Sequence, residues 1–373
     1  MAQPQHPPAP DPPDTGVTVD RDRPTTEFRI PSLRTLIRLG AQAAAIGLVA
    51  NAVLVVMTVE PGTWREVAGW RWQAAPILVV LMMVSWTANG LRVRAMAAAL
   101  HHRLTMLQAL SISLSATFGT AATPSSIGAP ILRVGLSRRA GIPMAEATAM
   151  TAVNYTIDMV YFAALTPFAV VVVLGDARWR HALDRVEVPD ARVLAAIGIV
   201  ALLVIAGGSW YRGRSDRRLL AGLRDRLRVD ERAGRTGAAL RSLVRHRPGA
   251  LLVDLALAAV QWTARYATLP VILWAMGVKL NPVPLILLQA GLFAFGPVLV
   301  VPGGGGGVEA LSAFVLSGLV PDGTVGVVVL IWRAVTYHLG LVVSGTVLVL
   351  VLGHLDRVFG AAAGDTDGAG SAP

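Results

Sequence analysis

The sequence predicts an all-α polytopic membrane protein with about six full spans and two broken, re-entrant helical hairpins arranged as an inverted repeat. Composition is the first observation. Of the 373 residues, 54% are hydrophobic and only 15% are charged, whereas soluble domains carry roughly 25% charged residues. The second is that several apolar runs are long enough to cross a bilayer. The third is that two of these runs are interrupted by proline and glycine in a similar way.

The candidate spans follow the apolar runs in chain order. They comprise residues 35–58, 74–98, 144–174, 191–210, 249–274 and 324–353. The broken segments comprise residues 105–139 and 281–319. We therefore assign residues 31–358 to one membrane domain. The proline-rich segment 1–30 and the small, polar segment 359–373 are predicted to be disordered tails.

Arginines in the loops predict the orientation. The linker 211–248 carries twelve arginines against four acidic residues, and cytoplasmic loops are rich in Arg and Lys. The loops 59–73 and 175–190 have no positive excess and fit the outer side. Both termini are then expected in the cytoplasm, with the protein in the plasma or inner membrane. The arginines that we count as inner-side charges outside the linker are Arg92, Arg94, Arg103, Arg133, Arg138 and Arg139.

The strongly basic linker also raises the alternative of nucleic-acid binding. Topology alone explains the charge, and arginines at the inner face attract anionic lipid headgroups. We therefore expect lipids as partners and no nucleic acid.

The two interruptions share a layout that predicts an internal repeat. Pro124 precedes Gly128 by the same offset by which Pro302 precedes Gly306. Repeat one covers about 74–174 and repeat two about 249–353. Because the additional span 191–210 separates them, the second copy must be inverted. Inverted repeats with discontinuous helices are typical of transporters.

A broken helix in a membrane frees backbone N–H and C=O groups, which protein or a water-filled cavity must satisfy. Glycine lets another group approach the backbone closely. A half-helix that begins near Val308 would direct its N–H groups and positive dipole end into the membrane, which predicts an anion site. A second half-helix begins near Pro130, and Ser125 and Ser126 are its candidate caps.

Asp158, Glu309 and Arg333 fall inside the predicted spans or breaks. A charge at this depth costs about 2.5–3.5 kcal/mol on insertion scales, so each should face a partner or a cavity. We expect Arg333 to pair with Glu309 or Asp158. Two interpretations stay open: the pair fastens the two halves together, or Arg333 meets an anionic headgroup. Asp254 and Arg265 are secondary candidates.

Two stretches resemble the lysylphosphatidylglycerol synthase transmembrane-region family of flippase-like membrane proteins. The first is "TPSSIGAPILRVGLSRRAGIPMAEATAMTAVNYTID", with Asn154 and Tyr155 where the family usually has Glu-Arg. The second is "VPGGGGGVEALSAFVLSGLV…IWRAVTYHLG", with Val308 where Arg is common and Gly340 where Pro is common. The positions that match the family pattern are Pro124, Gly128, Arg133, Gly141, Asp158, Pro302, Gly303, Gly304, Gly306, Glu309, Arg333, Thr336 and Tyr337.

The resemblance implies an integral membrane module that handles lipids. In the namesake proteins such a module moves aminoacylated phosphatidylglycerol, and a separate soluble domain, which we do not find here, carries the synthase reaction. We therefore expect no enzymatic activity and no cofactor or metal. The expected function is transport of an anionic phospholipid or lipid-linked headgroup through a midplane site between the repeats. Its candidate substrate-binding residues are Arg333, Glu309, Asp158, Gly303, Gly304, Gly306, Thr336, Tyr337, Pro124, Ser125, Ser126, Gly128 and Arg133.

Two alternatives stay open. The first is a non-transporting accessory protein of a lipid or glycolipid pathway, with a lipid synthase or glycosyltransferase as its partner. The second is a polyprenyl-linked glycosyltransferase, which would need carboxylates at the membrane surface. The Asp-x-Asp motif Asp20 to Asp22 lies in the predicted amino-terminal tail. That position argues against the second alternative.

Overall fold

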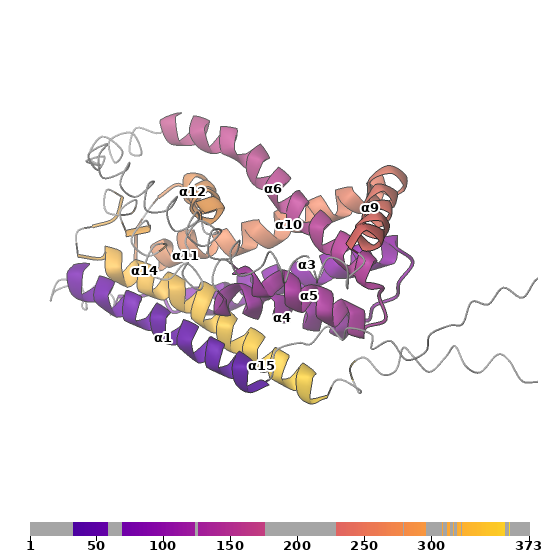
Figure 1. Cartoon of the computed structure of the whole chain (residues 1–373). Coiled ribbons are helices and arrows are strands. Elements are labelled where there is room, and N and C mark those ends of the chain that lie inside the picture. The colour runs from indigo at the N-terminus through magenta and orange to yellow at the C-terminus, as the bar shows by residue number, and fades with distance from the viewer. Residues whose placement is uncertain are drawn as a thin grey trace, which may run out of the picture.

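The computed structural model describes residues 33–58, 69–123, 126–175, 229–278, 280–295 and 323–354, with residues 308, 312–313, 316, 319–321 and 358. These residues form helices and turns, and none of the described residues lies in a strand. The α-helical fold class is therefore confirmed for this part of the chain (Figure 1).

The helices of the amino-terminal half follow the predicted segments. Three of them coincide with predicted spans, and the pair that follows the second helix coincides with the first broken segment. The helix before this break ends at Ala122 and the next begins at Gly128, so the predicted interruption is present. The elements are α1 (Leu33–Thr58), α3 (Ala74–Ala99), α4 (Met106–Ala122), α5 (Gly128–Arg139) and α6 (Met144–Gly175).

The carboxy-terminal half departs from the predicted segments in two places. The predicted span 249–274 is divided at Ala267, and the last span contains a π-helix between two α-helices. The elements are α9 (Val229–His246), α10 (Pro248–Tyr266), α11 (Thr268–Ala275), α12 (Pro282–Phe295), α14 (Val325–Arg333), η4 (Ala334–His338) and α15 (Leu339–Gly353).

Several predictions fall on residues outside the described part of the chain. These are the two tails, the span 191–210 and most of residues 296–319, which contain the second break. Within that break Val308 is described, and it is helical and buried. The number of spans and the inverted repeat therefore stay predictions.

Two helices of the described chain are long and apolar enough to cross a membrane. One is α3, with 26 residues, and the other is the continuous helix Val325–Gly353, with 29 residues. At 1.5 Å per residue both exceed the hydrocarbon core of about 30 Å. Ile77, Val80 and Met83 are exposed on α3, as expected for a helix that faces lipid. In Figure 1, α1 lies along the continuous helix, and α1 contacts both α14 and α15.

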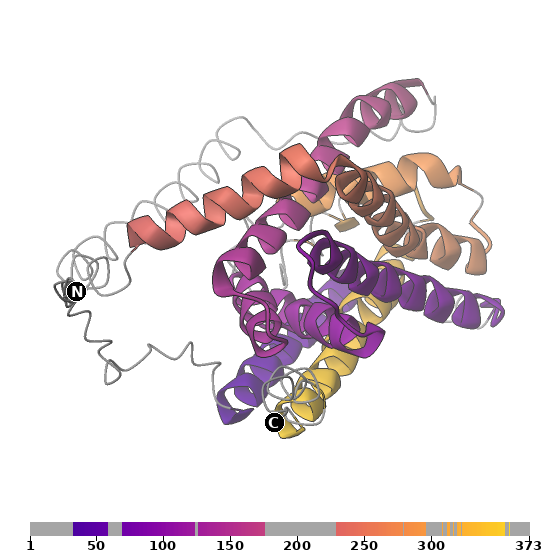
Figure 2. The same ribbon diagram turned by 90° about the vertical axis from the view of Figure 1, so that its right-hand side faces the viewer.

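Close backbone packing joins α4 to α5. A Cβ atom added at Gly119 would lie 2.5 Å from the carbonyl carbon of Gly128. At Gly90 of α3, an added Cβ would lie 2.8 Å from Leu110 Cδ2 of α4. Small residues let the two backbones approach closely. In a membrane, where the hydrophobic effect does not drive helices together, such close packing does. Figure 2 shows the same bundle from the side, with α9 packed against α6 at one end.

The amino terminus of α5 is capped by Thr123 rather than by a serine. Thr123 Oγ1 accepts a hydrogen bond from Gly128 N (2.8 Å) and donates to the carbonyl oxygen of Gly119 (2.6 Å). The residue at the N-cap position is Ile127, with no side-chain cap bond. Ser126 adopts a left-handed backbone conformation, with φ of 58°. The prediction that Ser126 caps this helix is therefore wrong, while Ser125 lies outside the described residues.

Replacing Gly119 with alanine should destabilise the protein, because the new methyl group meets backbone atoms that cannot rotate away. Overpacking of this kind costs about 1–3 kcal/mol. Thermal unfolding of purified protein in detergent measures the effect. Gly340→Ala is the matched control, since a Cβ there meets nothing within 4 Å. Equal unfolding temperatures for the two variants would contradict the close packing of α4 on α5.

Candidate functional site

A buried arginine joins three helices at the centre of the bundle. Arg92 of α3 binds Asp254 of α10 through Nε (2.7 Å to Oδ1) and Nη2 (3.4 Å to Oδ2). It binds Asp158 of α6 through Nη1 (2.7 Å). Its other bonds are from Nη1 to Gln261 Oε1 (3.0 Å) and from Nη2 to the carbonyl oxygen of Asn154 (2.9 Å). Because a guanidinium has five N–H donors, Arg92 is saturated.

Both carboxylates of this cluster have further donors. Trp262 Nε1 donates to Asp158 Oδ1 (2.9 Å), and Asn154 Nδ2 donates to Asp254 Oδ2 (2.9 Å). Arg92 and Asp254 are 1% and 0% exposed, so bulk water does not screen their attraction. We call Arg92, Asp158, Asp254, Asn154 and Gln261 the arginine–aspartate cluster.

Arg133 of α5 lies against one side of the cluster. It donates from Nη1 to Asn154 Oδ1 (3.1 Å) and from Nη2 to Asn89 Oδ1 (2.8 Å). Its Cζ lies 5.9 Å from the ring centre of Tyr155, and its Nε has no hydrogen-bond partner among the described residues. Unlike Arg92, Arg133 is therefore a buried cation that the described residues leave incompletely bonded.

Arg92 and Arg133 were both counted as inner-side charges of the loops in the sequence analysis. The structure places them 99% and 93% buried instead. They do not contribute loop charge to the orientation, which then depends on the basic linker and on Arg94, Arg103, Arg138 and Arg139.

A second polar cluster surrounds the π-helix in the last span. Arg333 is the final residue of α14, and its Cζ lies 4.4 Å from the ring centre of Tyr337. Tyr337 Oη donates to the carbonyl oxygens of Ala43 (3.0 Å) and Ala121 (3.3 Å). The tyrosine therefore holds the π-helix against α1 and against the end of α4, next to the first break.

The π-helix also receives an arginine from another helix. Arg265 near the end of α10 donates from Nη2 to the carbonyl oxygen of Thr336 (2.9 Å). Thr336 Oγ1 donates back to the carbonyl oxygen of Trp332 (2.7 Å). We call Arg265, Arg333, Thr336 and Tyr337 the π-helix cluster.

Gln289 of α12 fixes the break between α10 and α11. Its Nε2 donates to the carbonyl oxygen of Tyr266 (2.6 Å), which is the last residue of α10. Its Oε1 accepts a hydrogen bond from Trp332 Nε1 (3.0 Å). A buried amide thus satisfies a carbonyl that the break exposes and connects α10 to α14.

The structure divides the predicted site residues between the two clusters. Arg333, Thr336 and Tyr337 lie together in the π-helix cluster, whereas Asp158 and Arg133 lie in or beside the arginine–aspartate cluster. Gly128 lies at the amino terminus of α5, where its N–H donates a hydrogen bond to Thr123 Oγ1. The predicted site residues that lie outside the described part of the chain are Glu309, Gly303, Gly304, Gly306, Pro124 and Ser125.

We expected Arg333 to pair with Glu309 or Asp158. Asp158 forms its ion pair with Arg92, and the pair with Glu309 stays a prediction. Arg92 stands 66 residues before Asp158, so spacing along the chain gives no sign of the pair. The position of Asp254 inside an apolar run could have predicted a buried cation, because an acidic side chain inside a span needs a partner.

Replacing Arg92 with methionine should destabilise the protein strongly, because it leaves two buried carboxylates facing each other. Loss of one member of a buried ion pair costs about 3–5 kcal/mol. Thermal unfolding in detergent is the measurement, and Arg94→Met, at an exposed position of the same helix, is the control. Combining Arg92→Met with Asp158→Asn and Asp254→Asn should recover part of the loss. If Arg92→Met unfolds at the same temperature as Arg94→Met, the cluster does not stabilise the fold.

Comparisons with known proteins identify the family to which this chain belongs. Residues 42–344 match the family model of the lysylphosphatidylglycerol synthase TM region. A relative named UPF0104 membrane protein, from Archaeoglobus fulgidus, is 22% identical over 305 residues, which are 79% of this chain and 91% of the relative. Both arginine clusters lie within the matched region. The chain is a membrane protein and belongs to the lysylphosphatidylglycerol synthase transmembrane-region family.

Proposed function

We propose that this protein moves an anionic phospholipid or a lipid-linked anionic headgroup across the membrane. The observation that carries the proposal is the convergence of Arg265 and Arg333 on one π-helix inside an apolar span. Charged side chains at this depth are rare and mark substrate pathways in membrane proteins. π-Helical turns occur frequently at functional sites. Membership of a family of membrane lipid modules supports the same function.

The positions of the arginines favour the π-helix cluster as the headgroup site. Arg92 pairs with Asp158 and Asp254, and the adjoining Arg133 is hydrogen-bonded to Asn154. Arg265 and Arg333 meet at one π-helix. Guanidinium groups bind phosphates and carboxylates, the groups that an anionic headgroup carries.

The proposal includes the arrangement predicted from the sequence. The protein crosses the membrane several times with both termini in the cytoplasm, and two inverted repeats enclose the site. The headgroup enters the polar clusters while the acyl chains remain in the hydrocarbon. The proposed role is transport without a chemical reaction.

A liposome assay tests transport. The protein is reconstituted with tail-labelled phosphatidylglycerol, and reduction of the label from outside measures flipping. We expect Arg333→Gln to lower the flipping rate at least tenfold, because a single interaction with a charged group contributes about 1.5–3 kcal/mol. Arg333→Lys should retain part of the rate. Arg94→Gln, an exposed arginine of α3, is the matched control.

Two outcomes would contradict this function. The first is equal flipping by Arg333→Gln and Arg94→Gln. The second is no flipping by the wild type with several anionic phospholipids and with a polyprenyl phosphate. The accessory role would then be favoured, and the buried arginines would serve to fasten helices. Unfolding temperatures of all variants must be compared so that misfolding is not taken for loss of transport.

The orientation can be tested separately because the chain contains no cysteine. Single replacements Ser242→Cys in the basic linker and Asp184→Cys in the predicted outer loop provide two labelling sites. A membrane-impermeant maleimide applied to intact cells should label Asp184→Cys only. Labelling of both from the same side would contradict the inverted arrangement.

A further inference from the structure

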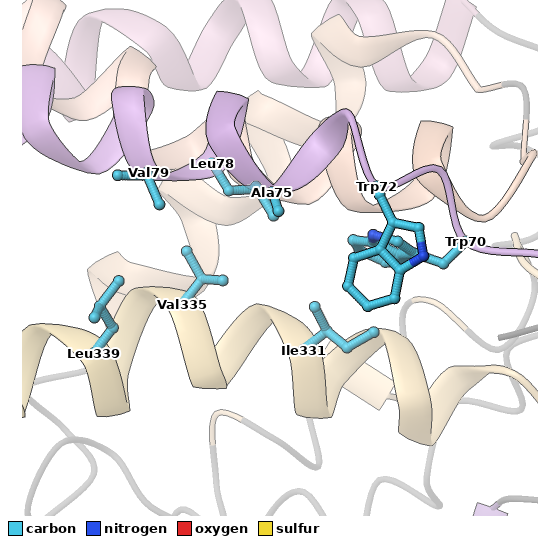
Figure 3. Close-up of a pocket in the computed structure, with 8 residues that line it drawn as sticks. All are labelled: Trp70, Trp72, Ala75, Leu78, Val79, Ile331, Val335 and Leu339. Atoms are coloured by element: carbon cyan, nitrogen blue, oxygen red, sulfur yellow. The ribbon is translucent and has the colours of Figure 1, made fainter. Parts of the chain in front are cut away.

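An apolar groove lies between the beginning of α3 and the last membrane helix, on residues that the arginine clusters do not use. It encloses about 390 Å³. Figure 3 shows the two helices as opposite walls, with two tryptophans at one end. The walls are formed by Ala75, Leu78 and Val79 of α3 and by Ile331, Val335 and Leu339 of α14, η4 and α15.

Both walls belong to the two candidate membrane spans of the described chain. The groove therefore lies at the depth of the lipid hydrocarbon. Val79 lines it and is 53% exposed, and Val80 beside it is 58% exposed. Such apolar exposure on a membrane helix fits contact with acyl chains.

The end of the groove has the composition of a membrane interface. Trp70 and Trp72 line it there, and tryptophan is enriched where hydrocarbon meets headgroups. Arg71 lies between them and is exposed. Its Nη1 donates to the carbonyl oxygen of Trp274 (3.5 Å), and its Cζ lies 5.3 Å from the Trp274 ring centre. These contacts hold an exposed cation against α11, one residue along the chain from each of the two tryptophans.

We propose that this groove binds one acyl chain of a membrane phospholipid, with the phosphate of that lipid against Arg71. The apolar walls receive the chain, and the aromatic and cationic end receives the glycerol and phosphate. The site is separate from the π-helix cluster, and its occupation does not require that the protein transports lipid.

The length of the groove suits a segment of hydrocarbon chain. Eight residues separate Ile331 from Leu339, which corresponds to about 12 Å along the helix axis. One acyl chain can lie along walls of this length, with its apolar surface against side chains of both helices.

The groove and Arg333 lie on different faces of one helix. Ile331 and Val335 stand two residues to either side of Arg333, and residues two apart on a helix point in roughly opposite directions. Arg333 is 2% exposed, while the groove opens beside exposed residues of α3. Substitutions in the groove can therefore be made without touching the proposed headgroup site.

Photocrosslinking tests the proposal. Full-length protein is reconstituted with phosphatidylglycerol that carries a diazirine in its acyl chain, and the crosslinked residues are mapped by mass spectrometry. We expect crosslinks to concentrate on Ile331, Val335 and Leu339. Ala75→Trp fills the groove and should reduce these crosslinks at least fivefold. Val80→Trp, on the same helix but outside the groove lining, is the matched control and should change them less than twofold.

A second measurement addresses the headgroup end. With the same probe in phosphatidylglycerol and in phosphatidylcholine, the wild type should favour the anionic lipid. Arg71→Gln should remove that preference, and Arg94→Gln should retain it. Equal labelling of the groove and of Met83, or groove labelling that Ala75→Trp leaves unchanged, would overturn the proposal. Groove labelling in a protein that does not flip lipid would support this site while contradicting the proposed transport.

Discussion

The ion pairs of Arg92 with Asp158 and Asp254 are the interaction on which the described structure depends. A lone charge at bilayer depth costs several kcal/mol, so none of the three side chains is stable there without the others. Since they come from α3, α6 and α10, satisfying the charges fixes the relative height and rotation of three helices. All five donors of Arg92 are used, which leaves none for a substrate. This cluster therefore stabilises the framework.

Contacts along α10 connect the arginine–aspartate cluster to the π-helix cluster. Trp262 donates to Asp158 and stacks on Tyr266 with ring centres 5.6 Å apart. The Tyr266 carbonyl is held by Gln289, which also accepts from Trp332, one residue before Arg333. Arg265, next to Tyr266 in the chain, bonds the π-helix directly. A continuous path of buried and partly buried contacts thus connects the arginine–aspartate cluster to Arg265 and Arg333.

The sequence predicts the helices well, because apolar length and Pro–Gly interruptions are local properties. The bounds of α1, α3 and α6 agree with the predicted spans to within two residues. It does not predict the partner of Asp158, because a pair between distant helices depends on how they pack. Arg92 was taken for a loop charge since it stands near the end of its span. The π-helix was not predicted, because a turn with i→i+5 hydrogen bonds has no distinctive residue pattern within an apolar run.

The two halves of the chain place arginine and tyrosine differently. Under the predicted repeat, Tyr155 corresponds to Arg333, because each stands 31 residues after the proline of its break, Pro124 or Pro302. In the first half the arginine near Tyr155 comes from α5, is hydrogen-bonded to two asparagine oxygens and adjoins the arginine–aspartate cluster. In the second half the arginine stands on the repeat position itself, and Arg265 bonds the same π-helix. Two arginines thus meet at one π-helix in the second half, and this is why the proposed headgroup site is placed there rather than in both halves.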